Sequence, residues 1–137
     1  DDFWVSVIHF RHGPLLRLTC NFYVDGEHND KSVTFHGDLG SVRLDSWIAP
    51  DSCLSLAPYG SGYQAIQFDG VSSEIDWSLG LLDLVRAVRT GHPHRASGAQ
   101  ASHVVEVLEA IKLSAEQHRS VRISSEFRLP QLPTGTD

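Results

Sequence analysis

The stretch HRASGAQASHVVEVLEAIKLSAEQHRSV, from His94 to Val121, contains signals for both ends of a long helix. Ser97 and Gln100 have the spacing of a capping box, in which a serine at the N-cap bonds the third helical residue. Apolar residues then recur at helical spacing: Val104, Val107, Leu108, Ile111 and Ala115. The stretch therefore predicts an amphipathic helix, and SVRIS (120–124) after it predicts a short strand.

A second helix is expected just upstream of this stretch. Its apolar residues also follow helical spacing: Trp77, Leu81, Leu84, Val85 and Val88. Gly91 suits the position after the helix end, where a left-handed backbone is common.

The first half of the chain alternates between apolar and polar residues, as half-buried strands do. Leu15 to Val24 has the clearest alternation, and Phe3 to Phe10 is its expected hairpin partner through the turn RHGP. Four more strands are expected at 31–36, 41–47, 52–57 and 63–68. Strands followed by two helices predict an α+β fold, in which the helices cover one face of an open, mainly antiparallel sheet.

Bulk properties bound the possible functions. The chain has 137 residues, and we expect one domain over 1–129 with a flexible tail over 130–137. A net charge of -6 excludes an electrostatic partnership with nucleic acid, and no apolar run approaches the ~20 residues that span a membrane. Cys20 and Cys53 lie in apolar segments, so we expect buried free thiols and a cytoplasmic location. Because methionine is absent, we expect a fragment, processed or excised from a longer polypeptide.

Four patterns are candidates for catalytic, cofactor or metal sites. GSGYQA (60–65) fits a dinucleotide-binding pattern, but a strand rather than a helix follows it, so a glycine-rich hairpin is the better interpretation. The histidines at 92–94 lack the spacing of a zinc site. His103 is expected in boundary packing, and Glu106 and Glu109 on a solvated helix face. The sequence therefore predicts no catalytic, cofactor-binding or metal-binding residue in this chain.

Several segments, in order, resemble the C-terminal part of the glucose–fructose oxidoreductase/inositol dehydrogenase (Gfo/Idh/MocA) family. The residues that carry the resemblance are Asp76–Trp77 with Gly80, Leu81 to Gly98, His103 to Ile111, Ser114 to Ser125, and Phe35 to Trp47. An arginine often precedes the glycine at the WSLG position of that family, and here a leucine does.

The resemblance implies an NAD(P)-dependent oxidoreductase that acts on the CH–OH group of a sugar, a polyol or a related compound. NAD or NADP, the cofactor fingerprint and the catalytic residues would belong to an N-terminal Rossmann domain outside this chain, which would therefore be inert alone. The present chain would be the substrate-side and oligomerisation domain. The alternative is a stand-alone, non-enzymatic binding or dimerisation module.

Two sets of residues are candidates for contacts in this domain. The resemblance implies that the loop from Tyr23 to Asp30 approaches substrate, so Tyr23, His28 and Asn29 are substrate-lining candidates, although an ordinary polar turn explains the loop as well. The mixed sheet face predicts a homo-oligomer, because its composition is that of an interface. The interface candidates are Arg17, Thr19, Tyr23, Arg43 and Trp47.

Overall fold

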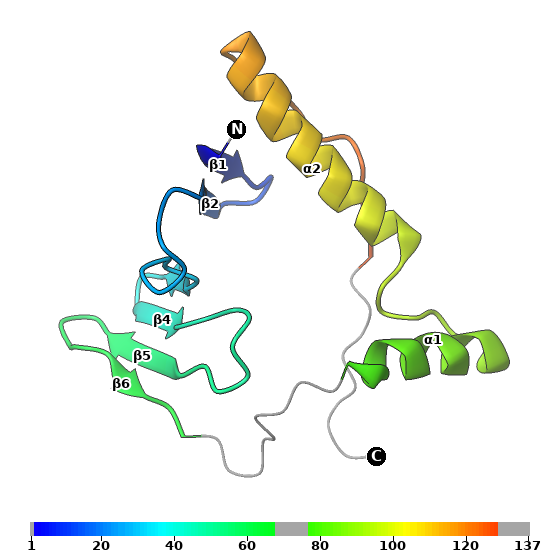
Figure 1. Cartoon of the computed structure of the whole chain (residues 1–137), viewed down its shortest axis with the longest axis horizontal. Coiled ribbons are helices and arrows are strands. Elements are labelled where there is room, and N and C mark those ends of the chain that lie inside the picture. The colour runs from blue at the N-terminus through cyan, green and yellow to red at the C-terminus, as the bar shows by residue number, and fades with distance from the viewer. Residues whose placement is uncertain (1, 68–76, 129–137) are drawn as a thin grey trace. The chain divides into compact units, whose positions relative to one another are not determined.

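The predicted strands form antiparallel hairpins, and they group into two sheets (Figure 1). The computed structural model describes residues 2–67 and 77–128. One sheet pairs β1 (Phe3–His9) with β2 (Leu15–Asn21). The other has the order β3-β4-β5-β6: Val33–His36, Gly40–Leu44, Leu54–Pro58 and Gln64–Ala65. The α+β class and the antiparallel pairing are confirmed, whereas the single sheet is divided, because a loop over 22–32 separates β2 from β3.

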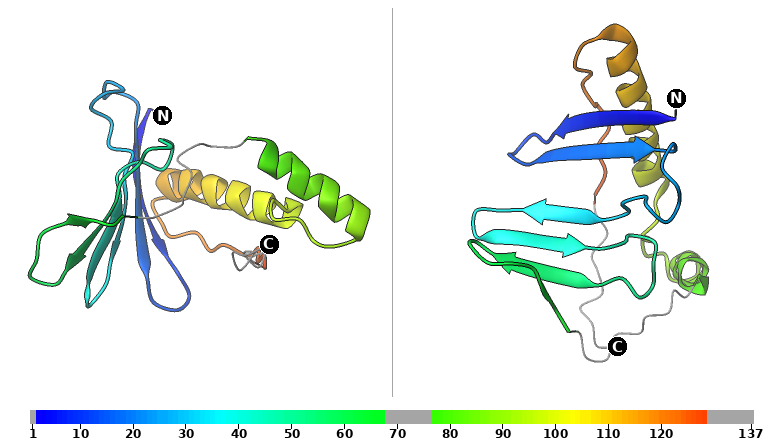
Figure 2. Two further views of the ribbon diagram at one scale, coloured as in Figure 1. Left: turned by 90° about the horizontal axis from the view of Figure 1, so that it is seen from below. Right: turned by 60° about the vertical axis from the view of Figure 1, so that its left-hand side comes forward.

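The β1–β2 hairpin is a regular ladder of seven residue pairs, from Phe3 with Asn21 to His9 with Leu15 (Figure 2). Gly13 in its turn has φ 116°, a conformation that glycine adopts without a steric penalty. Directly paired residues share a face, so Val5 lies beside Thr19 on the mixed face. The opposite, more covered face holds Trp4, Ser6, Ile8, Leu16, Leu18 and Cys20.

The four-stranded sheet has one apolar face and one polar face, as the alternation predicts. The register places these residues on the apolar face: Val33, Phe35, Val42, Leu44, Leu54 and Leu56. Thr34, His36 and Arg43 lie on the polar face, as expected. Gly40 begins β4 at φ 149°, where an added Cβ would lie 2.3 Å from the carbonyl oxygen of Ala57. The close approach of β5 therefore requires glycine at position 40.

Both predicted helices form, α1 over Ser78–Thr90 and α2 over Gly98–Gln117. Gly91 ends α1 with φ 72° and donates its N–H to the Ala87 carbonyl, which confirms its predicted place. The Ser97 side chain accepts the Gln100 N–H at 3.2 Å, so the N-cap is confirmed. The Ser97 N–H instead donates to the Arg95 carbonyl, so the reciprocal bond of a capping box is replaced.

The covered helix faces differ from the predicted apolar stripes. On α1, Ala87 is buried and Asp83 half-buried, whereas Leu81 and Val88 of the predicted stripe are exposed. On α2, the covered residues are Gln100, His103, Glu106, Val107, Ala110, Ile111 and Ser114. Asp83 and Glu106 lie on the covered faces because their carboxylates accept backbone N–H groups of other segments. These polar contacts explain why the covered faces differ from the predicted apolar stripes.

The strand predicted over 120–124 is wrong. Residues 121–128 are extended and run back along α2, outside any sheet (Figure 2). Odd-numbered residues of this segment are partly covered and even-numbered ones exposed. Alternating burial is also typical of a strand, which is why the sequence pattern alone could not exclude one.

The chain divides into two compact units, the sheet unit (Asp1–Ile75) and the helical unit (Asp76–Asp137). Among the described residues only Ala57, Ala87 and Ala110 are buried apolar side chains. Coverage of the sheet by the helices and a single domain over 1–129 stay predictions. The proposed tail over 130–137, and Asp76 of the family resemblance, lie outside the described residues.

Candidate functional site

The three substrate-lining candidates lie on the loop that follows β2. Tyr23 is 77% exposed, and its N–H donates to Asn21 Oδ1 at 3.0 Å. The N–H of His28 donates to the Asp25 carbonyl at 2.9 Å, which closes a tight turn before Asn29. His28 and Asn29 are also exposed, so all three side chains are accessible to a ligand.

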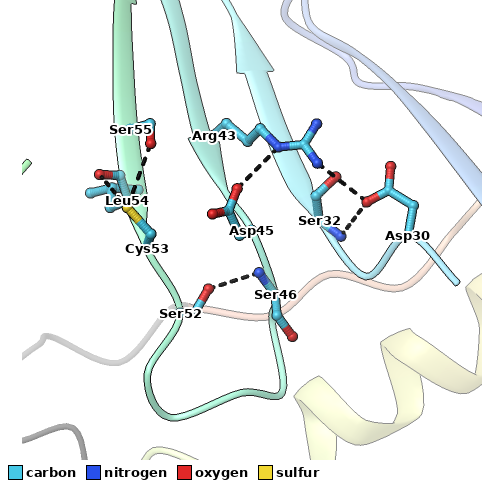
Figure 3. A network of polar contacts seen from close by, with 9 residues as sticks. All are labelled: Asp30, Ser32, Arg43, Asp45, Ser46, Ser52, Cys53, Leu54 and Ser55. Atoms are coloured by element: carbon cyan, nitrogen blue, oxygen red, sulfur yellow. Dashed lines mark hydrogen bonds and ion pairs between the residues drawn. The ribbon is translucent and has the colours of Figure 1, made fainter. Parts of the chain in front are cut away.

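The far end of this loop is tied to the four-stranded sheet by a polar network around Arg43 (Figure 3). Asp30 Oδ1 accepts the Ser32 N–H at 2.9 Å and lies 3.5 Å from Arg43 Nη2. Arg43 Nε donates to Asp45 Oδ1 at 3.2 Å. Arg43, on β4, therefore holds the loop end through Asp30 and also bonds Asp45, which directly follows β4.

The electrostatics of the network favour an ionised Asp30. Hydrogen bonds from Ser32, its side chain first and its backbone N–H second, hold the pKa of Asp30 below its usual range. The Arg43 guanidinium adds a smaller effect in the same direction, against the opposing effect of burial. The loop end is thus a charged, hydrogen-bonded anchor.

The predicted interface residues fall into two groups. Arg17 and Thr19 are exposed on β2 in the two-stranded sheet. Trp47 is 69% exposed after β4, and its N–H donates to the Lys31 carbonyl at 3.1 Å. Trp47 and Arg43 therefore both adjoin the end of the substrate-candidate loop. In the described ranges no hydrogen bond or ion pair joins this group to Arg17 or Thr19.

A second polar cluster joins α2 to the extended segment, and we call it the serine clasp: His103, Glu106, Ser124 and Ser125. Glu106 Oε1 accepts the N–H and the Oγ–H of Ser124 at 2.7 and 2.8 Å. Glu106 Oε2 accepts the Ser125 N–H at 2.9 Å. Two N–H groups of the extended segment, which has no sheet partner, are thus bonded by Glu106.

His103 completes the serine clasp from the preceding turn of α2. Its Nδ1 lies 2.7 Å from Ser125 Oγ and 3.0 Å from the Ser125 carbonyl oxygen. Because a carbonyl only accepts, a proton on Nδ1 would donate to it. The imidazole also packs against the ring of Phe127, with centroids 5.1 Å apart. Glu109 is exposed, as expected of a solvated helix face, whereas Glu106 is half-buried and bonded to Ser124 and Ser125.

The clasp strongly favours the ionised form of Glu106. Hydrogen bonds from Ser125 and Ser124, led by the Ser125 side chain, lower the pKa of Glu106 to about 2 from the usual 4.5. This carboxylate occupies the two serine N–H groups that could otherwise hold a substrate oxyanion. The Ser125–His103 pair therefore forms part of the connection between α2 and the extended segment.

The dinucleotide-binding pattern GSGYQA (60–65) lies in the β5–β6 hairpin. Residues 60–63 lie in the turn between β5 and β6, and Gln64–Ala65 form β6, so the hairpin interpretation of GSGYQA is confirmed. Because a strand rather than a helix follows the glycines, these residues do not fit a dinucleotide. No group of three or more potential metal ligands gathers among residues 2–67 and 77–128. Over the same residues, neither helix has the length and apolar character needed to cross a bilayer.

Comparisons with models of known protein families, with curated proteins and with solved structures return no match for this chain. The family resemblance and the functional residues that it implies stay predictions.

Proposed function

We propose that this chain is the substrate-side part of an NAD(P)-dependent oxidoreductase that acts on a sugar, a polyol or a related hydroxy compound. The observation that supports this proposal best is the loop after β2, which presents Tyr23, His28 and Asn29 to solvent. Its far end is held by Asp30 and Arg43, so the loop has a defined base. A phenol, an imidazole and an amide together offer the donors and acceptors that neighbouring hydroxyl groups require.

The proposal gives this chain recognition rather than redox chemistry. NAD or NADP and the catalytic groups belong, in this proposal, to a Rossmann domain encoded upstream. Self-association through the predicted interface residues Arg17, Thr19, Tyr23, Arg43 and Trp47 belongs to the same proposal. The free thiols Cys20 and Cys53 support a cytoplasmic location.

The test uses the chain together with the region encoded upstream. Formation of NADH or NADPH is followed by absorbance with a panel of polyols and sugars. Tyr23→Phe and Asn29→Ala should raise KM and leave kcat nearly unchanged, because they remove hydrogen bonds that ground state and transition state share. Glu27→Gln in the same loop is the matched control. Unchanged KM values in both loop variants of an active enzyme would refute the role of the loop.

The alternative function is a stand-alone binding or dimerisation module. It is favoured by the exposed apolar side chains of β1, where Phe3, Val5 and Val7 are each more than half exposed. The upstream sequence separates the two proposals: a G-x-G-x-x-G/A loop with a D-x-x-x-H pair supports the enzyme, and an unrelated domain supports the module. Saturable binding of dinucleotide by this chain alone at micromolar concentration would contradict both.

A further inference from the structure

The outer edge of β1 has backbone groups without partners. The bonds from the Phe22 N–H to the Asp2 carbonyl, and from the Phe10 N–H to the Pro14 carbonyl, fix the phase of the β1–β2 ladder. Even-numbered residues of β1 therefore turn their N–H and C=O groups toward β2, and odd-numbered residues turn theirs outward. Among the described residues, no backbone group bonds the outward-facing groups of β1 at positions 3, 5, 7 and 9.

This edge also lacks the features that prevent strand pairing. Proteins protect sheet edges with charges, prolines, bulges or very short strands. β1 is FWVSVIH, seven residues with no Lys, Arg, Asp, Glu or Pro and no break in its register. The other edge strands are different: β2 carries Arg17, β3 has four residues and β6 has two.

Ser6 lies at the centre of β1 and is unsatisfied. In the part of the chain that the structure describes, its Oγ is the buried side-chain polar atom without a hydrogen-bond partner. An unpaired buried hydroxyl is unfavourable, and hydrogen bonding to a neighbouring strand would remove the penalty. A rotation about Cα–Cβ is sufficient to turn this hydroxyl toward the free edge.

We propose that β1 pairs with β1 of a second copy, antiparallel, about a two-fold axis through Ser6. This register sets Val5 opposite Val7, Phe3 opposite His9 and Trp4 opposite Ile8. The outward-facing odd residues then form the hydrogen-bonded pairs, as the phase of the existing ladder requires. Ser6 faces its own copy in a close, non-hydrogen-bonded pair, where the two hydroxyls can bond each other. The two hairpins become one four-stranded sheet.

This contact is independent of the proposed enzymatic role. It uses the main-chain edge of β1, whereas the association described above uses the side chains of the predicted interface residues. A two-fold contact satisfies both copies at once, because the same strand supplies both sides. It also relieves the instability of an isolated two-stranded hairpin.

Two proline substitutions distinguish pairing through the edge of β1 from association through side chains of the predicted interface residues. Val5 and Thr19 are paired in the ladder on one face, but their N–H groups point to opposite edges. Val5→Pro removes an outward N–H without touching the β1–β2 ladder, and Thr19→Pro does the same at the edge of β2. Sedimentation at high micromolar concentration should show a loss of dimer for Val5→Pro and a retained dimer for Thr19→Pro. A monomeric wild type, or equal effects of the two prolines, would overturn the proposal.

A cross-link tests the register without a proline. In a Cys20→Ser, Cys53→Ser background, Ser6→Cys places two thiols across the two-fold axis, with Cα atoms about 4.5 Å apart, within disulfide range. Mild oxidation should give a covalent dimer. Val7→Cys is the control, since its two copies lie diagonally, roughly 7–8 Å apart. Failure of Ser6→Cys to cross-link, or equal cross-linking of both variants, would refute the Ser6-centred register.

A double variant tests the other possible contact. A dimer that Tyr23→Glu/Trp47→Glu dissociates and that Val5→Pro leaves intact would assign the contact to the predicted interface residues.

Discussion

Asp30 in the sheet unit and Glu106 in the helical unit both hold irregular backbone by accepting hydrogen bonds from serine. Asp30 reaches Ser32, only two residues away, and shares its charge with Arg43. Glu106 reaches Ser124 and Ser125, which follow it by 18 and 19 residues. The pKa of each carboxyl is lowered by its serine partners. A short-range carboxylate bond shapes one turn, whereas the long-range one decides whether a whole segment is docked.

The largest effect is expected when the face of α2 that carries the serine clasp receives a charge. Val107 is half-buried beside Glu106, so Val107→Asp would place an unpaired carboxylate there. We expect a loss of about 1–3 kcal/mol in the free energy of unfolding. Urea denaturation followed at the helical far-ultraviolet band measures it. Val104→Asp is the control on a side chain that is 51% exposed, and equal midpoints would mean that the covered face is wrongly assigned.

Removing the charge of Glu106 should release the segment and leave the helix intact. In Glu106→Gln, one acceptor oxygen becomes an amide NH₂, which faces the N–H group of Ser124 or of Ser125 donor to donor, so the two N–H groups can no longer both be accepted. We expect their amide hydrogens to lose protection against exchange, while the amides of α2 keep theirs. Glu109→Gln, three residues further along the helix, is the matched control. Unchanged protection at Ser124 and Ser125 would show that the clasp does not hold the segment.

Acid should open the clasp in a defined range. Because the pKa of Glu106 is lowered from 4.5 to about 2, its contribution is complete above about pH 4.5 and is lost as pH falls toward 2. The amide resonances of Ser124 and Ser125 should shift toward random-coil positions over this range. The Glu106→Gln variant should lack the transition. A wild-type transition centred at or above pH 4.5 would contradict the hydrogen bonding.

The smallest effect is expected at the short-range carboxylate. Asp30→Asn keeps an oxygen that can accept the Ser32 N–H and removes only the charge near Arg43. Since both partners of that ion pair are partly exposed, we expect a loss of about 0–1 kcal/mol in the free energy of unfolding. Thermal unfolding of Asp30→Asn beside Asp45→Asn measures it. A loss comparable to that of Val107→Asp would mean that the two carboxylates do not differ as proposed.

Most elements could be predicted because their causes are local. Alternation over Leu15 to Val24 predicts β2, and the glycine at position 91 predicts the end of α1. Ser97 caps α2 through a bond spanning three residues. The extended segment after α2 has the same alternation as a strand, so only its lack of a sheet partner distinguishes it.

A candidate site could be predicted where its residues are neighbours in the sequence, and not where they come from distant segments. The family resemblance implies that the loop from Tyr23 to Asp30 contacts substrate, and the structure shows that its residues are exposed; the substrate contact itself stays a prediction. The serine clasp was missed because its partners are far apart in the chain. Glu106 and His103 look like ordinary helix surface until the segment with Ser124 returns along the helix.

The distance between Glu106 and its serine partners has a consequence during synthesis. A ribosome adds Glu106 eighteen residues before Ser124, so α2 can form before its polar partners have been translated. Until the segment that carries Ser124 returns along the helix, Glu106 and His103 lack the partners that the serine clasp gives them.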